Sequence, residues 1–234
     1  MGLLSDILSE HFYRGSISSD FALSILRVLK EASRVVDFTS RGTSPLPTGS
    51  PAVDVLGYSL TILRDICASD DFSSPASERL VDSLVSSGIC PFLLDVLRDL
   101  EPPSTIRKIL FQRAMKESPS ISSNSSKVCP YKGFRRDIVA VIGNCTCGRK
   151  HVQDEIRHQN GILLLLQQCV IDEDQYLREW GMLTVSYLLE GNMENQQQVT
   201  ELELQGSVDT PEIANLGLKV DVDKKTGRVK LVNA

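Results

Sequence analysis

The sequence has few of the residues that most often carry chemistry or bind charged ligands. Of its 234 residues only three are His and one is Trp, and aromatic residues make up 6%. Acidic side chains outnumber basic ones by 30 to 25, which gives a net charge of −5. Proteins that bind a phosphate backbone concentrate positive charge, so we expect no nucleic-acid partner.

Long apolar runs and targeting signals are also lacking. No apolar run reaches the ~18–20 residues that a transmembrane helix needs, so we expect no membrane partner. The start, Met1–Asp6, lacks the basic stretch of a secretory signal, and Asp6 stands where a myristoylation signal has Ser or Thr. The six cysteines lie mostly within apolar helical segments, which favours buried free thiols over a disulfide framework. The sequence therefore predicts a cytoplasmic protein.

Residues 134–195 contain one helical pattern twice. The first copy has Asn144, then Gly161 and the apolar run 162–166, and the second has Tyr187 at the place of Asn144. These two positions are 43 residues apart, within the period of armadillo and HEAT repeats. Such a unit cannot bury its apolar face alone, so units stack and leave a long binding surface. The pattern predicts an all-α, armadillo- or HEAT-like right-handed α-solenoid that binds other proteins.

Apolar residues at spacings of three and four predict further helices along the chain. The expected helices cover residues 3–12, 19–38, 52–68, 80–85, 90–100, 105–117, 134–145, 152–156, 162–169, 175–190 and 192–202. In 105–117 the inward face is expected to hold Ile106, Ile109, Leu110 and Ala114. In 175–190 it is expected to hold Tyr176, Trp180, Leu183 and Tyr187 or Leu188.

Composition divides the chain into four parts. Residues 1–117 are N-terminal armadillo-like helical repeats, and residues 129–204 are the C-terminal repeats. Between them, 118–128 is a serine-rich insertion that is too polar to join a core, with a phosphoacceptor loop as the alternative interpretation. Residues 205–234 form a tail that changes from helical to alternating periodicity.

The tail is expected to end in a β-hairpin. Segments 218–222 and 228–232 alternate apolar and charged residues around a polar turn. A lone two-stranded hairpin is marginal in water, so its apolar face needs cover. We expect it to dock on the last helix near Leu202 and Leu204 as an end cap of the repeat stack.

Several short motifs between residues 131 and 234 resemble the C-terminal domain of the ataxin-10 family, with this chain as a short or truncated form. They are Gly133-Phe134-Arg135-Arg136-Asp137, Ile142-Gly143-Asn144, Gly161-Ile162, Cys169-x-Ile171-Asp172, Leu177-Arg178-Glu179-Trp180 and Leu216-Gly217-Leu218. Residues 1–130 fit the family only as generic helical repeats. The resemblance implies an armadillo-like, non-catalytic cytoplasmic scaffold with family roles in neuron survival, neurite outgrowth signalling, cytokinesis and self-association.

Two positions depart from the usual armadillo pattern. Leu163 stands where armadillo units usually have proline, and Tyr187 stands where they usually have an asparagine that binds a peptide backbone. Of the two copies only Asn144 retains that residue, so importin-style peptide recognition is not expected.

The candidate partner-binding residues are Asn144, Arg178, Trp180 and Tyr187. Trp180 has two interpretations: a half-buried anchor of its repeat, or, with Arg178, part of a binding hot spot, since Trp and Arg are enriched in such spots.

Cys145 and Cys147, followed by His151 and His158, are the nearest approach to a metal or catalytic cluster. Two helical positions two residues apart point about 200° away from each other, so both cysteines cannot converge on one zinc ion. A Cys147–His151 pair lacks the orienting third group that nucleophilic catalysis uses. We therefore expect no enzyme, metal or cofactor. The alternatives are a zinc- or thiol-dependent enzyme using Cys145, Cys147 and His151, or a fragment without a partner of its own.

Overall fold

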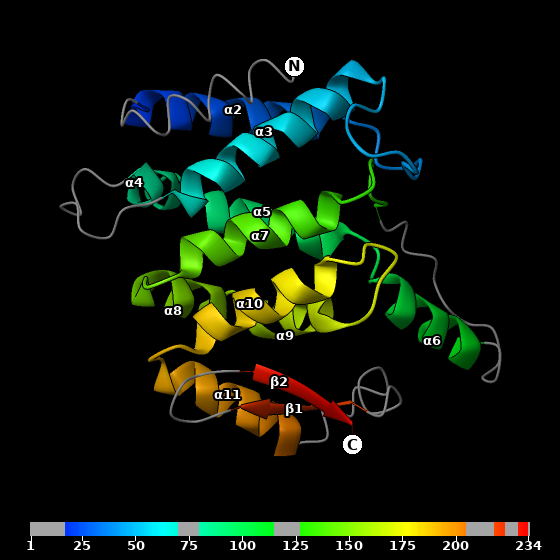
Figure 1. Cartoon of the computed structure of the whole chain (residues 1–234), viewed down its shortest axis with the longest axis vertical. Coiled ribbons are helices and arrows are strands. Elements are labelled where there is room, and N and C mark those ends of the chain that lie inside the picture. The colour runs from blue at the N-terminus through cyan, green and yellow to red at the C-terminus, as the bar shows by residue number, and fades with distance from the viewer. Residues whose placement is uncertain (1–16, 70–79, 115–126, 205–217, 223–228, 234) are drawn as a thin grey trace.

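The structure is a computed structural model that describes residues 17–69, 80–114, 127–204, 218–222 and 229–233. Within these ranges the chain is built from helices, with two short strands near its end. Figure 1 shows the helices following one another along the long axis, from α2 at one end to α11 at the other. The helix expected at 3–12 and nearly all of the serine-rich insertion lie outside the described residues.

The described residues of the first half form five helices, and each lies where the periodicity predicted one. They are α2 (Ser19–Val35), α3 (Pro51–Ala68), α4 (Leu80–Ser86), α5 (Ile89–Asp99) and α6 (Ser104–Ala114). Ser18 caps α2 by accepting a hydrogen bond from the Phe21 N–H at 3.2 Å. Between α4 and α5 the chain turns at Gly88, whose φ of +78° is favourable only for glycine.

The second half repeats this arrangement. It contains α7 (Phe134–Thr146), α8 (Lys150–His158), α9 (Gly161–Leu166), the 3₁₀ turn η2 (Gln167–Cys169), α10 (Leu177–Leu189) and α11 (Met193–Leu204). Asn192 caps the last helix, because its side chain accepts a hydrogen bond from the Asn195 N–H at 3.1 Å.

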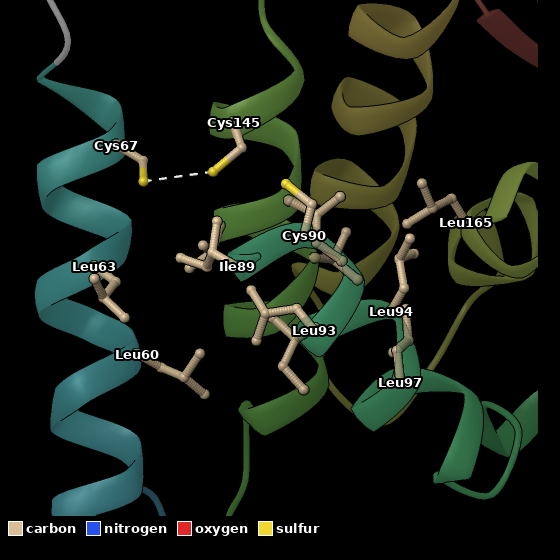
Figure 2. Close-up of a cluster of buried hydrophobic side chains, with 14 of the residues drawn as sticks. Leu60, Leu63, Cys67, Ile89, Cys90, Leu93, Leu94, Leu97, Cys145 and Leu165 are labelled. Atoms are coloured by element: carbon tan, nitrogen blue, oxygen red, sulfur yellow. Dashed lines mark hydrogen bonds between the residues drawn. The ribbon is translucent and has the colours of Figure 1, made fainter. Parts of the chain in front are cut away.

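Helices α3, α7 and α10 lie side by side, and α5 and α9 pack behind them (Figure 1). One continuous cluster of buried apolar side chains joins these helices. Figure 2 shows part of it, where Leu60 and Leu63 of α3 face Ile89 and Leu93 of α5. Burying such side chains stabilises the fold by roughly 1.5–3 kcal/mol each.

The contact between α7 and α10 depends on a small residue. A Cβ atom on Gly143 would lie only 2.4 Å from Oγ1 of Thr184. That hydroxyl donates to the Val139 carbonyl at 3.1 Å, so it is held in place against α7. Gly143 therefore lets the two helices approach closely.

The expected inward face of α10 is confirmed at Leu188, the alternative to Tyr187, but it is wrong by about a quarter of a turn at the other positions. The buried residues are Leu177, Gly181, Thr184, Val185, Leu188 and Leu189. Tyr176 and Leu183 are exposed, and Trp180 and Tyr187 are only partly buried. A Cβ on Gly181 would lie 2.6 Å from the Gln168 carbonyl oxygen, so the close-packed side of α10 is its small-residue side.

The inward face of α6 is also corrected. Ile106 is buried as expected, but Leu110 is exposed. The side chains of Ile109 and Ala114 lie outside those described. Helix α6 is held at its first turn, where the Ser104 N–H donates to Asp172 at 2.7 Å, and it extends away from the other helices (Figure 1).

A buried polar network attaches α11 to α8 and α10. Asn192 donates to the Gln153 side chain at 3.1 Å and to Asp154 at 2.9 Å. Asn195 donates to the Leu188 carbonyl at 2.8 Å, and Gln153 donates to the Tyr187 carbonyl at 2.8 Å. Gln153, Asn192 and Asn195 are all buried, so their amides bond to one another and to the backbone instead of to water.

The tail contains two antiparallel strands, β1 (Leu218–Val222) and β2 (Val229–Asn233), in which Val220 is opposite Leu231. Strand β2 lies against α10, whereas the expected docking place was the last helix. The side chains of Leu202 and Leu204, which were expected to receive the hairpin, lie outside those described.

In the described ranges no single helix is both long and apolar enough to cross a membrane; α4 and α5, bent by 61° at their junction, meet the length and composition of a span only when taken together.

Candidate interaction surface

An exposed row of large side chains runs along α10. Tyr176, the residue before its first turn, is 54% exposed, and Leu183 is 38% exposed. Trp180 and Tyr187 are half-buried beside them. The four residues are spaced by three or four positions and so lie on one side of the helix. We call these four residues the α10 stripe.

Two carboxylates border the α10 stripe. Glu179 and Glu190 are both exposed and occupy the same side of the helix, by the 3.6-residue period. Within the described part of the chain neither forms an ion pair, whereas most other acidic groups near this surface do. The stripe is therefore apolar and aromatic with a negatively charged edge.

Helix α7 packs against α10 and carries the half-buried Asn144 near its end; the half-buried Cys147, which follows its last turn, lies beside Tyr187. One N–H of the Asn144 amide donates to the Arg64 carbonyl of α3 at 3.2 Å, so this asparagine joins two helices of the molecule. Burial and the neighbouring Cys147 raise the pKa of Tyr187 above its usual value.

Arg178 does not belong to the α10 stripe. It is half-buried and lies close enough to Cys169 for its charge to oppose, in part, the rise that burial causes in the pKa of that thiol. The buried residues Val185 and Leu189 lie on the same side of α10 as Arg178. The structure thus places Trp180 and Tyr187 on one face with Asn144 on the adjoining helix, and it separates Arg178 from them.

Trp180 combines features of both earlier interpretations. It packs against the core cluster and is also partly exposed in the α10 stripe. Sequence reasoning missed Tyr176, Leu183, Glu179 and Glu190 as surface residues. The spacing of Tyr176 and Leu183 from Trp180, four and three residues, was visible, but it was assigned to the core.

An ion-pair cluster fixes the end of this surface near the start of α7. Asp137 is buried and lies 3.0 Å from Arg136 and 3.5 Å from Arg64, and it accepts from the Tyr131 hydroxyl at 2.8 Å. Arg136 also pairs with Asp174 at 3.2 Å. Burial, followed by the charge of Asp137, raises the pKa of Tyr131 well above its usual value, so the hydroxyl remains a donor. These contacts hold α3, α7 and the turn before α10 in one arrangement.

The cysteines do not converge on a metal or catalytic site. Cys145 is buried, with its Sγ 3.6 Å from Sγ of Cys67 and Cys90 close by (Figure 2). The hydrogen bond to Cys145 and burial raise the pKa of Cys67 and of Cys90 well above the usual value. Cys147 follows the last turn of α7 and lies beside Tyr187, and His151 is exposed on α8. Across the described ranges, no three His, Cys, Asp or Glu side chains are placed to hold a metal ion.

A cleft of about 810 Å³ lies between the end of α2 and α5. Its charged groups already have partners: for example, Lys127 pairs with Asp99 at 2.9 Å, Lys30 donates to the Ser87 carbonyl at 2.9 Å, and Asp95 pairs with Arg98 at 2.6 Å. The cleft therefore offers few groups for a ligand, and the α10 stripe is the stronger candidate.

The fold and this surface define a helix-rich protein with an exposed aromatic face. Residues 134–232 match the sequence model described as the spinocerebellar ataxia type 10 protein domain. Over these residues, which make up less than half of the chain, the sequence is similar to the ataxin-10 family. No solved structure matches the chain.

Curated relatives share the name of this family. The Ataxin-10 homolog of Dictyostelium discoideum is 34% identical over 44% of this chain and 17% of its own length. The Ataxin-10 homolog of Kluyveromyces lactis is 32% identical over 47% of this chain and 21% of its own. Ataxin-10 of Homo sapiens is 28% identical over 65% of this chain and 34% of its own. The chain thus spans well under half of the length of these relatives.

Proposed function

We propose that this chain is a non-catalytic protein–protein interaction scaffold of the armadillo-repeat type, with the α10 stripe as a partner-binding surface. The parallel placement of α3, α7 and α10, each with shorter helices packed behind it, supports a right-handed α-solenoid. The similarity of residues 134–232 to the ataxin-10 domain supports the same class of protein.

The observation that carries the proposal is the exposure of large apolar side chains on a well-packed helix. Isolated exposed apolar residues are normal, but a contiguous row with Trp and Tyr is typical of a binding surface. The small residues of α10 are buried instead, so the exposed row does not arise from a poorly packed helix.

The resemblance to the ataxin-10 family also implies cellular roles for the scaffold. We propose that it acts in the cytoplasm in cell survival signalling and cytokinesis, and that self-association through the same repeat surface is one of its interactions. Because the chain spans only part of these relatives, each of these roles is a proposal for this chain.

Proximity labelling with the full chain tests the binding surface. The double variant Tyr176→Ser/Leu183→Ser removes two exposed stripe residues and should lose the specific partners that the parent labels. The matched control is Val28→Ser/Val35→Ser on α2, where the two valines are also exposed, at 43% and 74%. Circular dichroism melts verify that both variants fold.

Retention of all partners by the stripe variant would contradict this assignment, and so would an equal loss in the α2 control. A parent chain that labels no saturable partner at all would reject the scaffold function itself.

A further inference from the structure

The α10 stripe has the dimensions of a site for one helix. From Tyr176 through Trp180 and Leu183 to Tyr187 its positions follow the i, i+4, i+7, i+11 spacing, which covers about 16 Å of helix axis. A partner helix that presents apolar residues at i, i+3 or i+4 and i+7 can place one side chain between each pair of stripe residues.

The charges that remain free along the stripe are negative. Glu179 and Glu190 have no ion pair in the described part of the chain. Two arginines on α3 and α7 are already paired, Arg64 with Asp65 and Asp137, and Arg136 with Asp137 and Asp174. An approaching ligand therefore meets an apolar row with unpaired carboxylates beside it.

Resting on the function proposed above, we propose that the occupant of the α10 stripe is a basic amphipathic helix of a partner protein. Its apolar residues pack between Tyr176, Trp180, Leu183 and Tyr187. Lysine or arginine residues beside that apolar face pair with Glu179 and Glu190. Opposite charges at the edge of the interface set orientation and suppress acidic partners, because like charges placed together are unfavourable.

Two synthetic peptides of 18 residues test this chemistry on the full chain. Both have leucine at the i, i+4, i+7, i+11 positions of one helix face; one has lysine at the flanking positions and the other glutamate. Fluorescence anisotropy should show binding of the leucine–lysine peptide, and binding of the leucine–glutamate peptide at least about tenfold weaker.

A charge swap makes the test specific to this surface. The variant Glu179→Lys/Glu190→Lys should reverse the preference between the two peptides. The control Glu31→Lys/Glu201→Lys makes the same change in net charge at exposed positions on α2 and α11, and it should keep the preference of the parent. The Tyr176→Ser/Leu183→Ser variant should bind the leucine–lysine peptide about tenfold more weakly than the parent, or weaker still.

Equal binding of both peptides, no binding of either, or a preference unchanged by the charge swap would each overturn the basic-helix assignment. These results differ from a failure of the scaffold function, which is scored by stripe-dependent labelling of cellular partners. If the stripe variant loses its cellular partners and neither peptide binds the parent chain, the scaffold function stands and only the basic-helix assignment is rejected.

Discussion

Cys169 ends the turn η2 between α9 and α10, where its thiol donates to the Leu165 carbonyl at 3.7 Å. Burial raises its pKa from 9.0 to about 12, and Arg178 opposes this rise only in part. Above pH 9 the unfolded chain loses this proton while the folded chain keeps it. The stability that this thiol contributes is therefore complete below pH 9 and is lost as the pH rises toward 12, by about 1.4 kcal/mol per pH unit.

Replacement of Cys169 should make the unfolding free energy fall less steeply as the pH rises above 9. Between pH 8 and pH 10.5, the Cys169→Ala variant should lose about 2 kcal/mol less of its unfolding free energy than the parent, as measured by urea titration. Leu166→Ala on the same segment is the control, because it creates a cavity without removing a titrating group. An identical pH dependence in parent and Cys169→Ala would show that the thiol is not protected in the fold.

Individual side chains on α10 show where sequence reasoning failed. Two sets of positions on this helix have helical spacing, one with Tyr176, Trp180 and Leu183, the other with Leu177, Gly181 and Thr184. Judged by hydrophobic size, the first set was assigned to the core. In the structure the second set is buried, because Gly181 and Thr184 allow close backbone approach to η2 and α7. Contact distance between elements is a tertiary property that periodicity does not contain.

Helices α7 and α10 meet through Gly143, and this contact yields a stability prediction. Gly143→Ala would gain up to about 1 kcal/mol in helix propensity, but its Cβ would overlap Thr184, and overpacking costs about 1–3 kcal/mol. We expect a net destabilisation of about 1–2 kcal/mol by chemical denaturation.

A second variant isolates the overlap. In a Thr184→Ala background the hydroxyl is gone and the nearest remaining side-chain atom, Cβ, lies 3.3 Å from the new methyl group. Gly143→Ala should then cost at least about 1 kcal/mol less than in the parent. If Gly143→Ala destabilises both backgrounds equally, overlap with the Thr184 hydroxyl is not the cause of the destabilisation.

The helices themselves were largely predictable, because each buries an apolar side that repeats at three and four residues, as in α3 with Leu56, Leu60 and Leu63. The cap at Asn192 was predictable for the same reason: the signal is local. The contacts that join the helices were not. Asp137 and Arg64 are far apart in the sequence, and nothing in either segment specifies that they meet. The α10 stripe was found in part, through Trp180 and Tyr187, while its acidic border emerged only from the fold.

The whole chain ends in a hairpin whose second strand lies against α10. We propose that the hairpin caps the helical stack, as terminal units of solenoids do. Deletion of residues 207–234 should leave a chain that still folds but self-associates more, because part of α10 loses its cover. Light scattering coupled to size-exclusion chromatography measures this. A shortened chain that stays monodisperse and equally stable while losing a partner would instead make the hairpin a docking element.

The amides of Gln153, Asn192 and Asn195 fix the position of α11 on the molecule. Apolar packing is not directional, so an apolar contact could slide by one helical turn, about 5.4 Å, and bury similar area. The same slide here would leave several buried amides without partners, at about 1–3 kcal/mol each. The last helix therefore has one register, and its bonds to α8 and α10 break together, so this end of the molecule opens in a single step instead of fraying residue by residue.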